Sequence, residues 1–236
     1  SVDDNSFINL KNYEVNPERS EIGWMSNNSV VLESKDDYED FSYIPEIARR
    51  IRDNGEPGMI NLYNIQKFGR YGKEDRKDKA NLVNPCGEIP LPNFGNCCLG
   101  HVNLTNMVSD GEFDWKRLAA SVRTGIRFLD NVLTVNAFPI EECREVAHKS
   151  RRIGLGFMGY HYMLIKLGIT YGSEKCLEFL ERLFATIRDE AYKQSVYLSR
   201  DKAPFAAFDR EQYLNEEFAK TLPARIRMLI KRHGIR

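Results

Sequence analysis

Apolar and polar positions alternate along the chain in a way that predicts short strands separated by helices. Residues 27–32 and 59–63 are predicted to be short strands, the first an apolar run that follows polar residues and the second a mostly apolar run that follows Pro57-Gly58. Between them, an acidic turn at residues 36–40 leads into a helical pattern that ends near Asn54-Gly55. The apolar face of that helix consists of Phe41, Ile44, Ile47, Ala48 and Ile51.

The second half of the chain shows longer helical patterns. One apolar stripe, in a helix that starts near Asp114 and is stopped by Pro139, consists of Trp115, Leu118, Val122, Ile126 and Leu129. Further helices are predicted over residues 140–152, 173–198, 213–219 and 223–233, and extended structure at 102–104. This alternation is typical of an α/β fold with partly parallel strands. Since nothing marks a domain boundary, residues 1–236 are expected to form a single segment.

The composition excludes several classes of protein. The 236 residues are 42% apolar and 29% charged, enough for one large or two small domains with a hydrophobic core. The 34 basic residues are matched by 34 acidic ones, so nothing favours nucleic acid as a partner. Residues 68–80 carry charges of alternating sign and are expected to be a solvated excursion.

The sequence shows neither a membrane-spanning segment nor a signal peptide. No apolar run approaches the ~20 residues that cross a bilayer, and no charged start leads into an apolar signal core. The five cysteines form no disulfide framework in a chain of this length, which fits a reducing compartment. The cytoplasm is therefore the expected location. The chain opens on Ser1 rather than Met, which suggests a fragment or a processed segment.

The most distinctive chemistry lies between residues 84 and 100. The sequence there reads Asn84-Pro85-Cys86-Gly87-Glu88-Ile89-Pro90-Leu91 and, after a short turn, Asn96-Cys97-Cys98-Leu99-Gly100. Prolines exclude a helix interior and glycines allow tight turns, so we expect an ordered loop that projects into a cavity. If the backbone is extended, Cys86 and Glu88 point the same way, and a thiol then lies beside a group that can move a proton.

Other interpretations of the cysteines stay open from the residues alone. A lone Cys is usually a small buried apolar residue, and Cys97 and Cys98 would then flank a turn in the core. Zinc binding is a weaker interpretation, because the spacing does not match a Cys-x-x-Cys pair and only His101 lies nearby. The residues alone therefore indicate a cysteine-based redox or nucleophilic loop and no metal site.

A second motif, at residues 154–159, matches the dinucleotide-binding pattern G-x-G-x-x-G. Its context argues against that function, because cationic residues rather than an apolar strand precede it and no suitably placed acid clearly follows. His148, in a predicted helix just before, is expected to be an ordinary surface or hydrogen-bonded histidine.

The Asn-Pro-Cys-Gly-Glu sequence, with a further Cys eleven residues after the first, resembles the active-site finger loop of the large catalytic subunit of ribonucleotide reductases. The short interval resembles the adenosylcobalamin-dependent class II enzymes, because in class I the second Cys lies farther along. The flanking sequence matches as well, with Glu56-Pro57-Gly58 before the loop and Leu99-Gly100 and Asn103-Leu104 after it.

The resemblance implies a fold for the whole chain. The family fold is a ten-stranded α/β barrel built from two parallel halves, with the finger loop inserted through its centre. The chain is then expected to be part of this barrel, roughly the middle third of the enzyme. The glycine-rich sequence implies a barrel strand at residues 153–157 that runs into a helix at 159–167, with small residues permitting close packing.

The resemblance also implies a reaction, the reduction of ribonucleoside di- or triphosphates to 2′-deoxyribonucleotides by a thiyl-radical mechanism with adenosylcobalamin as cofactor. Cys86 is similar to the residue that becomes the thiyl radical and removes the ribose 3′ hydrogen, and Glu88 to the base that takes the 3′-hydroxyl proton. Asn84 is similar to the amide that hydrogen-bonds at the ribose and holds the carboxylate. Cys97 is similar to one half of the dithiol that is oxidised to a disulfide.

Two polar segments before the loop are further candidates for nucleotide contacts. Residues 11–19 lie where the resembled family has its effector-sensing loop, so Asn12 and Arg19 are candidate effector-loop residues; an ordinary solvated connection is the alternative. Asn28 and Ser29, together with Asn27, are candidates to supply amide and hydroxyl groups to a ligand at the end of the strand. The alternative is that they only complete the turn before the strand. The implied partners are a nucleotide substrate, a nucleotide effector, a thioredoxin-like reductant and the missing flanking segments, without nucleic acid or membrane.

The sequence departs from the complete enzyme in several ways. No Cys precedes Cys86 that could pair with Cys97, and Cys98 stands where the family commonly has Asn and is expected to be a packing residue. The Pro-Thr-Gly-Thr phosphate loop and the C-terminal cysteines are missing. The isolated segment is therefore expected to be inactive. The alternatives are a class I large subunit and a non-catalytic structural remnant of the barrel.

Overall fold

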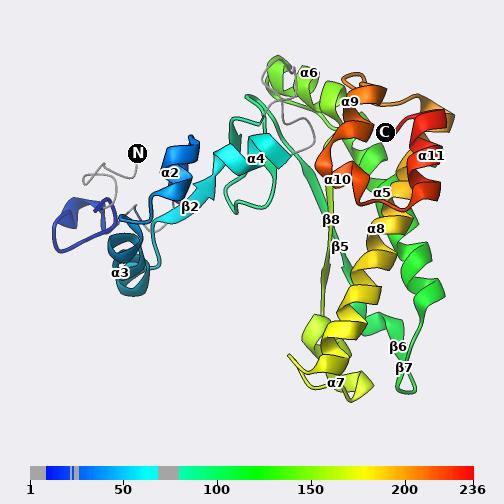
Figure 1. Ribbon diagram of the computed structural model, residues 1–236, viewed down its shortest axis with the longest axis horizontal. Coiled ribbons are helices and arrows are strands. Elements are labelled where there is room, and N and C mark those ends of the chain that lie inside the picture. The colour runs from blue at the N-terminus through cyan, green and yellow to red at the C-terminus, as the bar shows by residue number, and fades with distance from the viewer. Residues whose placement is uncertain (1–8, 22, 24–26, 69–79) are drawn as a thin grey trace. The chain divides into compact units, whose positions relative to one another are not determined.

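The computed structural model describes residues 9–21, 23, 27–68 and 80–236 and divides the chain into two compact units. Unit 1 is Ser1–Asn93 and unit 2 is Phe94–Arg236; Figure 1 labels their helices and strands. The predicted excursion at residues 68–80 lies almost wholly outside the described residues. That the whole chain forms one segment of a barrel domain stays a prediction.

Unit 1 alternates strands and short helices. In chain order they are the 3-10 helix η1 (Pro17–Arg19), β1 (Ser29–Leu32), α2 (Lys35–Glu39), α3 (Ile44–Asn54), β2 (Gly58–Asn61), α4 (Leu62–Phe68), β3 (Leu82–Val83) and β4 (Pro90–Leu91).

A parallel pair of strands, β1 and β2, forms the centre of unit 1, with Ser29 opposite Gly58. Val30 and Leu32 point to the same face of β1 because side chains repeat every second residue, and both are buried with Ile47 of α3. The two apolar runs predicted as strands therefore pair with each other, and the helix between them covers one face.

Two boundaries in unit 1 differ from the prediction. The single helix predicted from the acidic turn to Asn54 is split into α2 and α3, because Asp40 is extended and its Oδ1 accepts a hydrogen bond from the Ser42 N at 2.9 Å. The second strand ends at Asn61, whose Oδ1 accepts a hydrogen bond from the Asn64 N at 2.8 Å where α4 begins. Asn is a preferred residue at helix starts, so the signal for the missed helix was present in the sequence.

Unit 2 contains the longer elements. In chain order they are β5 (Cys98–Asn103), the 3-10 helix η3 (Leu104–Met107), β6 (Val108–Ser109), β7 (Glu112–Phe113), α5 (Trp115–Val135), α6 (Glu141–Ser150), β8 (Ile153–Met158), α7 (Tyr160–Leu167), α8 (Glu174–Lys202), α9 (Arg210–Asn215), α10 (Glu217–Lys220) and α11 (Ala224–His233).

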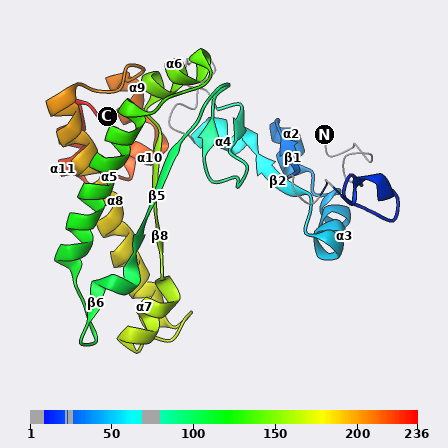
Figure 2. The same ribbon diagram turned by 180° about the vertical axis from the view of Figure 1, so that it is seen from behind.

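A second parallel pair, β5 and β8, runs through unit 2 with Cys98 opposite Ile153. Helix α5 packs on both strands and α8 packs on α5, as Figures 1 and 2 show. The approach of α5 requires glycine, because a Cβ at Gly125 would lie 2.9 Å from the Leu155 Cδ1. The buried residues of this core are Val102, Leu104, Met107, Val108, Leu118, Val122, Met163, Leu164, Ile169, Cys176 and Leu183.

Most predicted elements of unit 2 are present with shifted ends. The strand and the helix implied by the resemblance are β8 and α7. Helix α8 starts after Ser173, whose Oγ accepts a hydrogen bond from the Cys176 N at 3.2 Å, and it runs past the predicted end to Lys202. The helix predicted over residues 213–219 is instead two helices, because the backbone of Glu216 between them is extended.

The predicted α/β class is confirmed, with one parallel strand pair in each unit. Every sheet formed by the described residues has two strands, so the ten-stranded barrel is not closed within them. None of the helices described here is both long and apolar enough to cross a membrane.

Candidate active site

Cys86 and Glu88 lie in the loop of an antiparallel hairpin formed by β3 and β4. Asn84 closes this loop, because its backbone N donates to the Ile89 O at 3.0 Å and its Oδ1 accepts a hydrogen bond from the Ile89 N at 2.8 Å. Among the described residues the Asn84 Nδ2 has no partner, so this side chain is held through its oxygen and presents its nitrogen.

The loop is a tight turn rather than an extended segment. The Gly87 N donates to the Asn84 O at 2.9 Å, and Gly87 has a φ of +86°, which favours glycine. Pro85 occupies the second position of this four-residue turn, where its fixed φ is preferred. The extended backbone under which Cys86 and Glu88 would point the same way is therefore not present, and their side chains do not follow the strand alternation.

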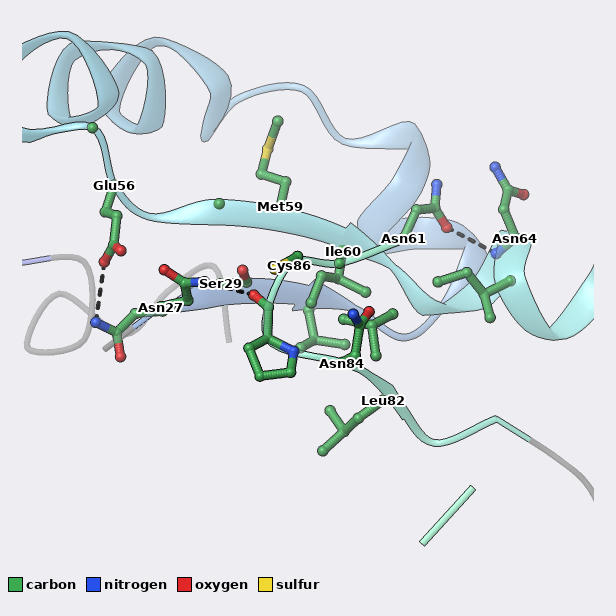
Figure 3. A pocket seen from close by; sticks show the side chains of 18 residues that line it. Asn27, Ser29, Glu56, Met59, Ile60, Asn61, Asn64, Leu82, Asn84 and Cys86 are labelled. Atoms are coloured by element: carbon green, nitrogen blue, oxygen red, sulfur yellow. Dashed lines mark hydrogen bonds between the residues drawn. The ribbon is translucent and has the colours of Figure 1, made fainter. Parts of the chain in front are cut away.

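A pocket of about 810 Å³ lies beside the turn and is lined by β1, β2, the start of α4 and the hairpin (Figure 3). The volume is in the range of small-molecule sites, roughly 300–1,000 Å³. Of the predicted site residues, the structure brings together Asn28, Ser29, Asn84 and Cys86 at this pocket. The thiol is exposed and the pocket supplies amide and hydroxyl groups around it.

Asn27 anchors the turn to the segment that enters β1. Its Nδ2 donates to the Pro85 O at 2.7 Å, across a sequence separation of 58 residues. This hydrogen bond holds the residue directly before Cys86, so Asn27 does more than complete the turn before a strand. Nothing in the local sequence pattern indicated so distant a partner.

Other predicted site residues lie away from the pocket lining. Glu88 is exposed and does not line it. The Oδ1 of Asn12 accepts a hydrogen bond from the Glu14 N at 3.3 Å, and Arg19 is the exposed end of η1. Cys97 belongs to unit 2.

Cys97 and Cys98 stand in different surroundings although they are neighbours. Cys97 is half-buried just before β5, with its Sγ 3.6 Å from the Cys98 O. Burial raises the pKa of the Cys98 thiol, and the positive charge of Arg151 opposes this only in part. Cys98 therefore remains a protonated thiol at neutral pH, which supports its assignment to packing.

Sequence reasoning missed two charged residues at this site. Glu56 lines the pocket, and its Oε1 lies 2.6 Å from the Nζ of the buried Lys11. The sequence signals were a charged residue directly before the Pro57-Gly58 turn and a lysine in a stretch of few charges.

The glycines of the G-x-G-x-x-G match serve packing. Gly156 lies inside β8, where a Cβ would be 3.0 Å from the His101 ring, and Gly159 has a φ of +73° with a Cβ position 2.3 Å from the Thr105 Oγ1. In a dinucleotide site the glycines form the turn after the strand, whereas here the first two lie within the strand. Their spacing therefore reflects strand and helix contacts.

The fold and the site define an α/β protein that presents a thiol on a hairpin turn at a small-molecule pocket. The family model for the barrel domain of ribonucleotide reductase matches residues 28–236. The chain belongs to the ribonucleotide reductase family, as the sequence around Cys86 predicted.

Curated ribonucleotide reductases are similar to this chain over most of its length. A vitamin B12-dependent ribonucleoside-diphosphate reductase of Mycobacterium tuberculosis is 35% identical over 179 residues, 76% of this chain and 25% of the relative. A protein of the same name from Thermoplasma acidophilum is 39% identical over 164 residues, 68% of this chain and 21% of the relative. An adenosylcobalamin-dependent ribonucleoside-triphosphate reductase of Euglena gracilis is 36% identical over 172 residues, 71% of this chain and 22% of the relative. The chain thus spans about a quarter of the length of the relatives it matches.

Proposed function

We propose that this chain is the part of a ribonucleotide reductase that carries its radical-forming thiol, and that the enzyme reduces ribonucleotides to 2′-deoxyribonucleotides with adenosylcobalamin. The observation that carries the proposal is the placement of Cys86 at a pocket on a turn held by Asn27 and Asn84. A thiyl radical needs a rigid position, because a mobile sulfur would meet competing hydrogen donors.

In the proposed reaction the sulfur of Cys86, as a thiyl radical, takes the 3′ hydrogen atom of the ribose. Glu88 accepts the 3′-hydroxyl proton, and the Nδ2 of Asn84 donates a hydrogen bond at the ribose or to that carboxylate. The 2′ oxygen leaves as water, while Cys97 and a second thiol from elsewhere in the enzyme supply two electrons and become a disulfide. Cys86 then returns the hydrogen atom to C3′.

The cofactor is proposed because relatives of this chain are named as vitamin B12- or adenosylcobalamin-dependent. The structure allows one test of fit, since a radical source must reach the sulfur, and Cys86 is exposed at the end of its hairpin. When bound, adenosylcobalamin supplies the radical that removes the thiol hydrogen. Within the described part of the chain, no group of three or more His, Cys, Asp or Glu is placed to hold a metal ion, and we assign no ligand to the cobalt.

The proposed partners are a ribonucleoside di- or triphosphate, a nucleotide effector and a thioredoxin-like reductant. Asn28 and Ser29 are proposed substrate contacts at the pocket, and Asn12 and Arg19 proposed effector contacts. The barrel would be completed by further strands pairing with the two-stranded sheets seen here. Because the chain spans about a quarter of its relatives, we expect it to be inactive by itself.

The proposal is tested by nucleotide reduction with the chain joined to the flanking segments that its relatives have. Deoxynucleotide formation should require adenosylcobalamin, and Cys86→Ser and Glu88→Gln should each lower kcat by about a thousandfold or more. Activity that requires a separate radical-generating subunit instead would identify a class I enzyme. Unchanged activity in both variants, or none in the unmodified enzyme with every proposed partner, would leave a structural remnant as the better explanation.

A further inference from the structure

The carboxylate of Glu56 joins two segments that are far apart in sequence. Its Oε1 accepts from the Lys11 Nζ at 2.6 Å, and its Oε2 accepts from the Asn28 Nδ2 at 3.1 Å. The pair is well enclosed, since the side chains of Lys11 and Glu56 are only 9% and 17% exposed. Charged hydrogen bonds in such surroundings hold their partners more firmly than bonds at an open surface.

Asn28 is held on its backbone as well. The Gly58 N donates to the Asn28 O at 2.8 Å, and this bond begins the parallel pairing of β1 with β2. With its Nδ2 turned to Glu56, the amide of Asn28 has a fixed orientation, its oxygen facing away from that carboxylate. Both residues line the pocket, so the orientation of one pocket amide is set by a charged group.

Asn27, the residue before Asn28, links this group to the turn that bears the thiol. Asn27 donates to the Pro85 O at 2.7 Å, and Pro85 directly precedes Cys86. A continuous series of hydrogen bonds therefore runs from Lys11 through Glu56 to the Asn27-Asn28 dipeptide and on to the turn that carries the thiol.

We propose that Glu56 is a positioning residue for the reactive thiol, because its carboxylate fixes the Asn27-Asn28 dipeptide, and that dipeptide holds the turn bearing Cys86 against the pocket. Lys11 places a positive charge 2.6 Å from the Glu56 Oε1, which holds the carboxylate in position and ties residues 9–21 to the same group. The inference deepens the proposed function and rests on it only for the identity of the site.

The first test measures the position of the thiol without using catalysis. In the full-length enzyme, alkylation of Cys86 by iodoacetamide is followed by mass spectrometry, with Cys143 of unit 2 as internal reference. In Glu56→Gln the side-chain amide nitrogen faces either Lys11 or the Asn28 Nδ2, and a donor facing a donor means that one hydrogen bond is lost. The alkylation rate of Cys86 should then change about fivefold or more. Glu39→Gln, which breaks the exposed pair with Lys35, is the matched control and should change nothing.

Charge reversal separates positioning from simple stabilisation. Lys11→Glu combined with Glu56→Lys restores an ion pair and should recover the urea midpoint lost in each single variant. The lysine introduced at position 56 cannot accept from the Asn28 Nδ2, so the amide must turn over, and the alkylation rate of Cys86 should remain altered. Recovery of both quantities would show that Glu56 serves stability alone.

The two proposals fail in different ways. If the unmodified enzyme reduces no ribonucleotide, the proposed function fails, while the alkylation measurements still decide the role of Glu56. If the enzyme is active and Glu56→Gln matches Glu39→Gln in alkylation rate and in the split between kcat and KM, the positioning role is refuted. Asn27→Ala provides a second variant with an intact ion pair, and it should alter Cys86 alkylation in the same direction as Glu56→Gln.

Discussion

Arg151 and Asp130 form a buried ion pair that joins the end of α6, just before β8, to the C-terminal part of α5. The Nε and Nη2 of Arg151 donate to the Asp130 Oδ1 at 3.0 and 2.6 Å, and the Nη2 also donates to the Asp130 O at 2.8 Å. The side chains are 7% and 6% exposed. Arg151 takes a left-handed backbone conformation with a φ of +46° at the end of α6, so the pair also directs the chain from α6 into β8.

Asp130 is the centre of a larger charged cluster. Its Oδ2 accepts from the Lys202 Nζ at 3.0 Å and its Oδ1 from the Arg236 Nε at 2.8 Å. Asp130→Asn would replace one acceptor oxygen by a donor facing these cations, and we expect it to lower the free energy of unfolding by about 3–5 kcal/mol. Urea unfolding of the chain, followed by circular dichroism, measures this effect.

Glu141→Gln is the control for this substitution. It breaks the exposed pair with Arg144 on α6, which contributes little because both side chains are more than half exposed. Equal urea midpoints for the two variants would show that the Asp130 cluster adds nothing to stability beyond a surface pair.

The same cluster predicts a pH dependence. Burial alone would raise the pKa of Asp130, but hydrogen bonds from Lys202 and Arg151 and the charges of Arg151 and Arg236 outweigh it and hold that pKa below its ordinary value. Because the folded pKa lies below the unfolded one, the stabilisation is fully present above the unfolded value and is lost as the pH falls toward the folded value. The stability difference between the unmodified chain and Asp130→Asn should therefore shrink below about pH 4. A difference that stays constant through that range in urea titrations would contradict the assignment.

Substitution of two glycines with similar backbone angles can distinguish the cost of backbone strain from the cost of a steric clash with a neighbouring side chain. Gly159 and Gly168 have φ of +73° and +64°, but a Cβ at Gly159 would lie 2.3 Å from the Thr105 Oγ1, whereas nothing lies within 4 Å at Gly168. Gly168→Ala should cost about 1–2 kcal/mol from backbone strain alone, and Gly159→Ala should cost clearly more. Thermal unfolding of both variants gives the difference, and equal costs would show that Thr105 moves aside freely.

The sequence was informative where periodicity and local residue preferences act together. The strands β1 and β2, the stripe that became α5 and the start of α8 at Ser173 follow from apolar spacing and helix capping, which are local properties. The strand β5 starts at Cys98, inside the segment that was predicted to be a loop, and β8 was implied only by the resemblance. The split at Asp40 and the early start of α4 at Asn61 were missed because hydrogen bonds of single polar side chains decide them.

The chemistry assigned to the candidate site stays a prediction, and its geometry could not be predicted from the sequence. The resemblance proposed Asn84, Cys86 and Glu88, of which Asn84 and Cys86 line the pocket, and the turn at Gly87 excludes a strand alternation of their side chains. The contacts of Asn27 with Pro85 and of Glu56 with Lys11 join residues 58 and 45 positions apart, and no local pattern encodes such pairs.

Asn84 has a structural role and a proposed catalytic role, and substitutions can separate the two. Its Oδ1 closes the hairpin by accepting from the Ile89 N, and its Nδ2 is the proposed donor at the ribose. Asn84→Asp keeps the acceptor and removes the donor, so the urea midpoint should be nearly unchanged while kcat falls about 10- to 100-fold. Asn84→Ala should change both. Full activity in Asn84→Asp would mean that Asn84 only closes the hairpin.

The adjacent cysteines Cys97 and Cys98 provide the sharpest test of the role assigned to each thiol. If Cys97 belongs to the reducing dithiol, Cys97→Ser should still release tritium from a 3′-labelled substrate, because in the proposed reaction Cys86 removes that hydrogen before the dithiol acts. The same variant should form no deoxynucleotide, since two electrons can no longer be supplied. Cys86→Ser should lose both signals.

Cys98→Ser is the matched control in the full-length enzyme. Cys98 is the first residue of β5, opposite Ile153, and its raised pKa keeps the thiol protonated, so its removal should leave deoxynucleotide formation within about twofold of the unmodified enzyme. The opposite result, an active Cys97→Ser and an inactive Cys98→Ser, would transfer the dithiol role to Cys98. The reductant would then have to reach a thiol that is half-buried at the start of β5.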